Sequence, residues 1–286
     1  MAAQNVFAPA KLNLFLHVTG RRSDGYHLLQ SILTLIDVGD RITLAIRQDG
    51  AIRRVNPIEG ISPDIDLTFR AATALKNTTG CPLGVDIELE KVTPMGAGLG
   101  GGSADAAAVL LALNGLWQLN LSNAALREIG LRLGADVPFF VFGKTAFAEG
   151  IGETLAEIRI PVWWYVVLIP KILVPTPFVF SQPDLTRSTP HVKISDFSAG
   201  VLVDALLQTS NDLQAVVLKA FPAVAASLAA LSAVSKKSVF GARMTGSGAG
   251  VFAAFETEQS ALEAYQQLSP EFIGFVAKGL EKHPLL

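Results

Sequence analysis

The chain has 286 residues, of which 50% are apolar and 17% charged, so it can bury a sizeable core and is not intrinsically disordered. Its formal net charge is only −2, with acidic and basic residues interspersed, which argues against nucleic acid or a membrane surface as its partner. The single cysteine, Cys81, excludes an intramolecular disulfide bond and a cysteine-based metal cluster.

Targeting and membrane signals are not evident in the sequence. The densest apolar run, VWWYVVLI at 162–169, is far shorter than the roughly 18 residues of a spanning helix and indicates a buried strand. In the N-terminal stretch, Lys11 and Asn13 interrupt the apolar residues, and no basic region precedes them. We therefore expect a cytoplasmic protein.

The first predicted element is a strand over 6–18, where alternation in polarity gives one buried face and one polar face that carries Lys11 and Asn13. A turn at Asp24-Gly25 follows. The elements predicted after this turn are strands over 31–46 and 84–91 and helices over 64–77, 103–113 and 122–133. We expect the strand over 31–46 to be interrupted near Gly39-Asp40.

The pattern changes after about Glu157, which predicts a first domain over 1–157 and a second over 158–286. The second half contains a proline-rich segment, PKILVPTPFVF, and a second glycine loop, MTGSGAG. Its predicted elements are strands over 162–169, 251–255 and 272–277, helices up to about 233, and a helix over 258–268. Strands and helices mix without strict alternation, which favours an α+β fold over a doubly wound sheet.

A glycine-rich loop lies between the strand over 84–91 and the helix that comes after it. Its sequence, TPMGAGLGGGSADAA, places five glycines in seven positions. Glycines allow the backbone amides to approach an anion closely, and the helix dipole favours negative charge at that point. Ser103 stands where its hydroxyl could cap the helix or reach a phosphate or a metal ion. The alternative is a structural turn, but five glycines exceed what a turn needs, so we expect phosphate binding.

The helix that follows the glycine loop excludes some classes of phosphate-binding motif. The segment contains G-x-G-x-x-G, but a helix stands where a Rossmann unit would place a second strand with an acidic residue. The Walker A pattern lacks its Gly-Lys-Ser/Thr, and the HRD and DFG elements of protein kinases are missing. The loop therefore belongs to another nucleotide- or phosphate-binding lineage.

Lys11 and Asp136 are the candidates for chemistry, and each has a structural alternative. Lys11 could be an exposed lysine on a half-solvated strand. Asp136 could be a helix N-cap with Pro138 just inside the helix. If the two side chains meet, Asp136 could instead deprotonate a hydroxyl while the lysine keeps the carboxylate ionised.

The other candidates remain open on the residues alone. Tyr26 and His27 come after a turn and could be packing residues or ligands, and Phe178 and Phe180 could be core residues or a platform for a flat ring. The remaining histidines have no partners at metal spacing, so no metal ligand is assigned.

The segment PMGAGLGGGSADAA resembles the phosphate-binding motif of the GHMP kinase superfamily. PAKLNLFLHVTGRRSDGYH, GADVPFF, PTPFVF and ARMTGSGAGVF are similar to one branch of that family, and the matches run from about residue 8 to 255. The resemblance implies a two-domain fold, with an N-terminal ribosomal-protein-S5-like domain, a C-terminal ferredoxin-like domain and the site in the cleft between them. It also implies ATP-dependent phosphorylation of the 2-hydroxyl of a cytidine diphosphate-linked methylerythritol, in non-mevalonate isoprenoid biosynthesis.

The resemblance also implies a role for individual residues. Lys11 and Asp136 match the catalytic pair, with Asp136 as the general base. The loop that holds the ATP phosphates matches Pro94, Met95, Gly96, Ala97, Gly98, Leu99, Gly100, Gly101, Gly102, Ser103 and Ala104. The substrate residues match Asn13, Tyr26, His27, Thr176, Phe180, Gly246, Ser247 and Gly248. Among these, Tyr26 and Phe180 would sandwich the cytosine ring.

ATP is the implied co-substrate, with Mg²⁺ whose ligands are not identified, and the protein is expected to be a monomer or weak homodimer. Three positions depart from the family pattern. Ala97 replaces a common glycine, which should matter little if its φ is negative. Ala104 replaces a second serine, and Asp66 replaces an asparagine near the expected adenine pocket. The rival functions are another GHMP kinase of the homoserine or mevalonate type, and a nucleotide-binding relative without catalysis.

Overall fold

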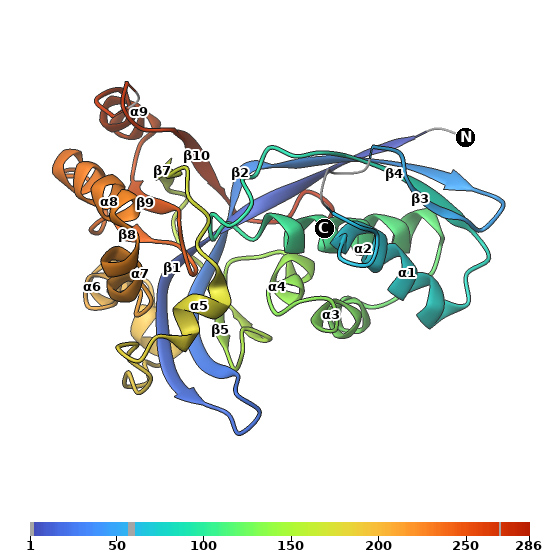
Figure 1. Cartoon of the computed structure of the whole chain (residues 1–286), viewed down its shortest axis with the longest axis horizontal. Helices are drawn as coiled ribbons and strands as arrows, with labels where there is room; N and C mark the ends of the chain where they lie inside the picture. The colour runs from blue at the N-terminus through green and yellow to red at the C-terminus, as the bar shows by residue number, and fades with distance from the viewer. Residues whose placement is uncertain (1–2, 57–60, 269) are drawn as a thin grey trace.

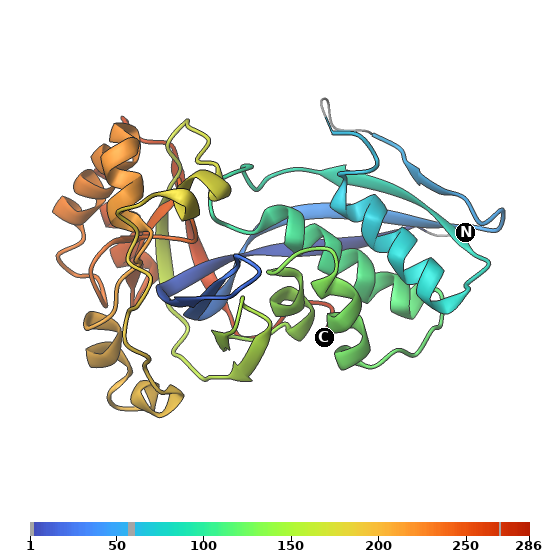
Figure 2. The ribbon, with the colours of Figure 1, turned by 60° about the horizontal axis from the view of Figure 1, so that its bottom comes forward.

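The computed structural model of the chain describes residues 3–56, 61–268 and 270–286. Two long antiparallel strands, β1 (Gln4–Arg21) and β2 (His27–Arg47), run through the whole molecule and join its two halves (Figure 1). Helices α1 to α4 lie in one half and α6 to α9 in the other (Figure 2 gives a second view). The fold is α+β, as the sequence predicted.

The strand β2 is continuous, so the predicted interruption near Gly39-Asp40 is wrong. Gly39 pairs with Pro9 in the hairpin, and a Cβ on Gly39 would lie 2.1 Å from the carbonyl oxygen of Ala8. The glycine therefore permits close approach of two strands and does not mark a turn.

Both faces of β1 are buried over residues 8–18, so the prediction that only one face is buried is wrong. Its pairing with β2 shifts register between Pro9 and Lys11 and again between Asn13 and Phe15. Because a bulge changes which way the following side chains point, Phe15 is fully buried together with Lys11 and Asn13.

The ten strands form one connected sheet among the described residues. Its main path is β3 (Ile52–Arg54), β4 (Gly84–Glu90), β2, β10 (Gly274–Leu280), β7 (Trp164–Leu168), β9 (Val251–Phe255) and β8 (Arg243–Met244). Off this path, β2 also pairs with β1 and with β5 (Ala146–Glu149), which pairs with β6 (Thr154–Glu157). Only β3 and β4 are parallel within this set of named strands.

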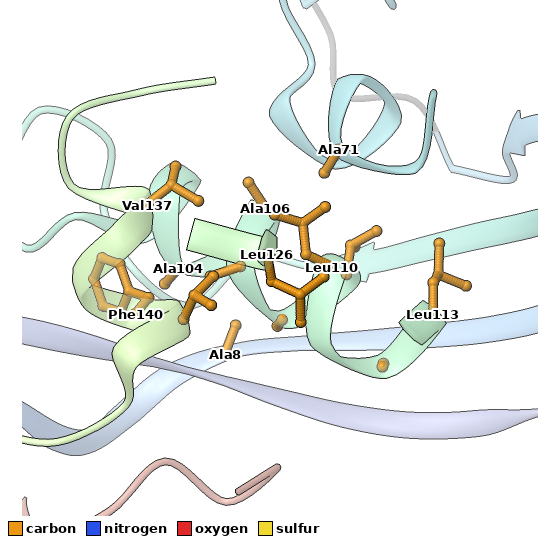
Figure 3. Packing of buried hydrophobic residues seen from close by; sticks show 14 of the residues in the cluster. Ala8, Ala71, Ala104, Ala106, Leu110, Leu113, Leu126, Val137 and Phe140 are labelled. Carbon is orange, nitrogen blue, oxygen red and sulfur yellow. The ribbon is translucent and has the colours of Figure 1, made fainter. Parts of the chain in front are cut away.

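The helices of the first half are α1 (Leu67–Thr79), α2 (Gly101–Leu116), α3 (Asn123–Leu131) and α4 (Val137–Phe142). Helix α2 is apolar almost all round, which is typical of a buried helix. Figure 3 shows its residues Ala104, Ala106 and Leu110 between Ala8 of β1 on one side and Ala71 of α1 on the other. The small alanines let α2 lie close to the sheet, and this packing fixes the point at which the glycine loop ends.

The second half contains α5 (Thr176–Ser181), a 3₁₀ turn (Ile194–Phe197), α6 (Leu202–Leu207), α7 (Gln214–Ala220), α8 (Pro222–Val234) and α9 (Glu258–Gln266). Among the described residues no single helix is long and apolar enough to cross a membrane. Helices α7 and α8 reach that length together, but the chain bends by 118° between them.

The end of the described chain returns to the first half. Strand β10 pairs with β7 on one side and with β2 on the other. Beyond it, the amide of His283 donates to the carbonyl of Gly143 at 2.8 Å, and the side chain of Leu286 lies against Gly143 at the end of α4. The division into domains 1–157 and 158–286 remains a proposal, with its boundary in the connection between β6 and β7.

Candidate active site

A cleft of about 920 Å³ collects the predicted site residues from both halves of the molecule. The predicted residues that line it are Lys11, Asn13, Tyr26, His27, residues 94–103, Asp136, Thr176, Phe180, Gly246, Ser247 and Gly248. Ala104 alone of the predicted set is not on the cleft, because it is fully buried in α2. A methyl group suits this packed position, which accounts for the alanine there.

The glycine loop is wound so that α2 starts at its end. Gly96, Gly98 and Gly100 have φ values of 71°, 73° and 72°, a region that favours glycine. Ala97 is not among the described residues with positive φ, so the alanine is accepted there without strain. Gly100 is the N-cap of α2 and has no side-chain cap. The first amides of the helix are therefore available to an anion.

Ser103 lies in the first turn of α2, so the prediction that it could cap the helix is wrong. The helix begins two residues earlier than expected, at Gly101. Ser103 lines the cleft, and its hydroxyl remains a candidate contact for phosphate.

The two glycine loops are hydrogen-bonded to each other. The amide of Ala249 donates to the carbonyl of Gly96 at 2.9 Å, and that of Gly250 donates to Ala97 at 3.1 Å. A Cβ on Gly98 would lie 2.1 Å from the carbonyl oxygen of Thr245. The second glycine loop therefore packs directly against the first, and Gly98 lies so close to Thr245 that a larger residue would not fit.

Lys11 and Asp136 come together in the cleft, and the structure excludes the alternative that Lys11 is an exposed lysine. The Lys11 side chain is only 4% exposed, and its Nζ lies 3.8 Å from the carboxylate of Asp136. Asp136 occupies the N-cap position of α4 but makes no capping hydrogen bond, and its side chain is 42% exposed. The carboxylate is therefore free to meet a ligand, with a buried cation beside it.

Asn13 orients the lysine. The Nζ of Lys11 donates a short hydrogen bond to Oδ1 of Asn13, whose Nδ2 donates to the hydroxyl of Ser31 at 2.9 Å. Burial lowers the pKa of Lys11 from its usual value, and the charge of Asp136 offsets part of that change.

The aromatic part of the cleft is formed by Tyr26, His27 and Phe180. Phe180 of α5 stacks on His27, with ring centroids 4.8 Å apart and planes at 27°. Tyr26 is 59% exposed at the mouth of the cleft. The hydroxyls of Thr176 and Ser247 lie 2.7 Å apart, so α5 contacts the second glycine loop. The predicted sandwich of a base between Tyr26 and Phe180 remains a prediction.

A buried charge cluster beneath the glycine loop was missed. Lys91, at the end of β4, donates to Asp105 of α2 at 2.9 Å and to Asp40 of β2. Asp40 also accepts from the amides of Val92 and Thr93, at 2.6 and 2.7 Å. Burial raises the pKa of Asp105 to about 8, although the Lys91 ammonium opposes this. Asp40 comes directly after a glycine, which misled the prediction toward a turn.

Arg187 was also missed, since it lies in a polar stretch without periodicity. Its Nε donates to Nε2 of His27 at 3.2 Å.

Asp66, the third of the positions that depart from the family pattern, caps α1 and forms an ion pair with Arg54 at 2.8 Å. It does not line the cleft, whereas its neighbour Leu67 does.

Comparison with known proteins places the chain in a family of kinases. The model of the GHMP kinases N terminal domain matches residues 66–144, and that of the GHMP kinases C terminal domain matches residues 198–273. The chain belongs to the GHMP kinase family.

Two relatives that are about half identical over nearly the whole chain share one name. The chain is 54% identical over 278 residues to the 4-diphosphocytidyl-2-C-methyl-D-erythritol kinase of Thiobacillus denitrificans, covering 97% of this chain and 96% of the relative. It is 51% identical over 285 residues to the kinase of that name from Burkholderia cenocepacia, covering 99% and 96%.

Solved structures give the same result. The crystal structure of a 4-(cytidine 5'-diphospho)-2C-methyl-D-erythritol kinase superposes with a TM-score of 0.82 at 32% identity, covering 96% of this chain and 99% of that one. A homoserine kinase from Cytophaga hutchinsonii, at 17% identity and a TM-score of 0.70 over 99% and 96% of the two chains, shares the fold.

Proposed function

We propose that the protein is an ATP-dependent kinase that phosphorylates the 2-hydroxyl of 4-diphosphocytidyl-2-C-methyl-D-erythritol, a step of non-mevalonate isoprenoid precursor biosynthesis. The observation that carries the proposal is the Lys11–Asp136 pair, set between a glycine loop and an aromatic recess in one cleft. Identity of about half over nearly the full chain to kinases of that name supports the choice of substrate.

Phosphoryl transfer depends mainly on positioning and on stabilising charge. The glycine loop and the uncapped start of α2 would bind the phosphates of ATP through backbone amides. The cytosine would lie in the recess formed by Tyr26, His27 and Phe180, which would leave the substrate hydroxyl near Asp136.

Asp136 would then act as general base. Its carboxylate takes the hydroxyl proton while the hydroxyl oxygen bonds to the γ-phosphorus of ATP, the bond to the β,γ-bridging oxygen breaks, and ADP leaves. The ammonium of Lys11, held by Asn13, lies beside the reacting groups and stabilises the negative charge that develops there.

Magnesium would enter with the nucleotide. No group of three or more His, Cys, Asp or Glu side chains within the described residues could hold a metal ion. Mg²⁺ would be bound mainly by the ATP phosphates and water, where it neutralises phosphate charge.

The substrate assignment is tested by measuring ADP release with three alcohols: the cytidylyl substrate, homoserine and mevalonate. We expect turnover with the first alone. Turnover with homoserine or mevalonate instead would assign the chain to another GHMP kinase activity. Phosphorylation of none of the three would favour a nucleotide-binding protein without catalysis. The cytoplasmic location and the monomeric or weakly dimeric state stay predictions, and gel filtration would measure the second.

The role of Asp136 predicts the effect of Asp136→Asn. This change removes the base and keeps the shape, so turnover should fall by about 10²- to 10⁴-fold while the dissociation constant of ATP changes little. Steady-state kinetics and calorimetric titration with ATP would measure the two effects. Asp184→Asn is the control, because Asp184 is exposed and pairs only with Lys219 among the described residues. Near-normal turnover of Asp136→Asn would show that the base lies elsewhere.

A further inference from the structure

Arg187 does not line the cleft, but it forms hydrogen bonds with two residues of the aromatic recess, His27 and Phe180. Its Nε donates to Nε2 of His27 at 3.2 Å. Its Nη2 donates to the carbonyls of Phe180 and Gln182, at 3.0 and 2.7 Å, and its Nη1 donates to that of Leu185 at 3.1 Å. All three guanidinium nitrogens are therefore used. One side chain holds both the imidazole of His27 and the end of the helix that carries Phe180.

The contact between Arg187 and His27 fixes the tautomer of the imidazole. A guanidinium offers only donors, so Nε2 of His27 must accept and carries no proton. A neutral imidazole has one donor and one acceptor, which places the proton on Nδ1. Within the described residues Nδ1 has no hydrogen-bond partner, and His27 lines the cleft. It is available to a bound molecule.

The same contact disfavours the charged form of His27. An imidazolium would place an N–H on Nε2 directly against the N–H of Arg187. Arg187 and Arg21 are positive groups near the ring, and both disfavour a further positive charge on it. Partial burial, Arg187 and Arg21 all lower the pKa of His27.

We propose that Arg187 is a positioning residue for substrate recognition: it fixes His27 as the neutral tautomer that donates from Nδ1, and it holds Phe180 in contact with that ring. The recess thereby presents a donor to a pyrimidine edge, and cytosine offers acceptors there at O2 and N3. The inference rests on the proposed function for the identity of the ligand. The state of His27 can be measured without it.

A purely structural reading of Arg187 is that it only satisfies carbonyls at the end of α5, which lack partners within the helix. In that case the state of His27 would not depend on Arg187. The two readings differ in the tautomer and in the pKa of one ring, and both can be observed directly.

The first test needs no variant. The chain has four histidines, so long-range ¹H–¹⁵N NMR of the histidine-labelled full-length protein resolves each ring, and His27→Gln identifies the signal. We expect His27 to be neutral at pH 7 with its proton on Nδ1. A proton on Nε2, or a cationic ring at pH 7, overturns the proposal whether or not the kinase activity is found.

The second test compares Arg187→Gln, Arg187→Lys and Arg21→Gln. Arg187→Gln should raise the pKa of His27 and populate the Nε2–H tautomer, and it should raise KM for the cytidylyl substrate roughly tenfold, the effect of one hydrogen bond. KM for ATP should stay within about twofold. Arg187→Lys keeps the positive charge but loses the planar guanidinium with its several N–H donors, so it should not restore the Nδ1–H tautomer of His27.

Arg21→Gln removes the other nearby charge, and it should leave the proton on Nδ1 because Arg21 donates to Gly25 and not to the ring. An unchanged tautomer and pKa of His27 in folded Arg187→Gln would overturn the proposal. If Arg187→Gln fails to fold, the wild-type NMR spectrum still tests the proposal, because a proton on Nε2 of His27 or a cationic ring at pH 7 would overturn it. Absence of kinase activity together with the expected tautomer would contradict the proposed function and leave the positioning of His27 intact.

Discussion

At the scale of single residues, Gly98 determines how closely the two glycine loops can approach each other. It has a positive φ of 73°, and its α-carbon faces the carbonyl of Thr245 in the second glycine loop. Ala97, beside it, is buried and not strained. One loop therefore contains a position where a methyl group is accepted and a position where it is not.

The prediction is that Gly98→Ala separates the two glycine loops. The left-handed φ costs about 1–2 kcal/mol, and overlap with Thr245 adds about 1–3 kcal/mol. We expect unfolding in denaturant at clearly lower concentration and a higher KM for ATP.

Gly115→Ala is the matched control for Gly98→Ala. Gly115 lies in α2, and its added Cβ meets nothing within 4 Å, so this change should stabilise the protein by about 0.5–1 kcal/mol. Equal stability of the two variants would contradict the close approach of the loops.

At the scale of elements, the cluster of Asp40, Lys91 and Asp105 joins β2, the end of β4 and helix α2. Two carboxylates share one ammonium in a buried place. Burial, and next to it the neighbouring Asp40, raise the pKa of Asp105 to about 8, while Lys91 opposes this change. The glycine loop is thus connected to the sheet by a cluster whose charge depends on pH.

The prediction concerns stability and pH. Because its folded pKa is about 8 and its unfolded pKa about 4, Asp105 contributes stability that is fully present below pH 4 and is lost as the pH rises through 8. Asp105→Asn should remove this slope, so the variant should gain stability over the wild type as the pH rises from 4 to 8, by about 3 kcal/mol at pH 6.

Asp40→Asn is the comparison, since Asp40 accepts from two amides as well as from Lys91. It should cost about 2–4 kcal/mol. Urea unfolding at several pH values measures both variants. A wild-type slope that persists in Asp105→Asn would assign it to another group.

The elements that could be predicted from sequence are those with many residues in one pattern. The strand predicted over 251–255 matches β9, and the helices predicted over 64–77, 103–113 and 122–133 match α1, α2 and α3 closely, whereas the short α4 was not predicted. The strands β3, β5 and β6 contain only three or four residues each, too few for a period to show. The bulges of β1 were equally invisible in the sequence, and so was the burial of Lys11, whose side chain lies against Gly100 and Gly246 of the two glycine loops.

The candidate site was predictable where glycine spacing or a family motif marks it. Arg187 and Asp40 were not, because their partners are distant in sequence: His27 lies 160 residues from Arg187. Such contacts depend on how the halves are folded together, which no local pattern records.

At the scale of the whole molecule, His283 stabilises the return of the chain to the first half. The residue is 1% exposed, and its Nε2 has no partner in the described structure. Burial lowers its pKa from 6.5 to about 4. The residue is therefore neutral in the folded protein.

This predicts a loss of stability in acid. His283 contributes stability that is present above its unfolded pKa of 6.5 and is lost as the pH falls through 4, about 3 kcal/mol in total. His283→Asn keeps an acceptor for the amide of Leu285 and should flatten the curve of melting temperature against pH in this range. His191→Asn, at an exposed position, should leave the curve unchanged. Identical curves for both variants would contradict the role of His283.

The central place of β10 has a consequence for how the protein is made. Its residues are translated after those of every other described strand, yet it lies between β2 and β7. About a hundred residues separate β7 from β10 along the chain, and a ribosome takes roughly 5 to 20 seconds to add them. During that interval the nascent polypeptide carries two strand edges that await the same partner. A ribosome that stalls before β10 therefore exposes both edges to other chains, and chaperones that cover strand edges should associate with this protein mainly during that interval.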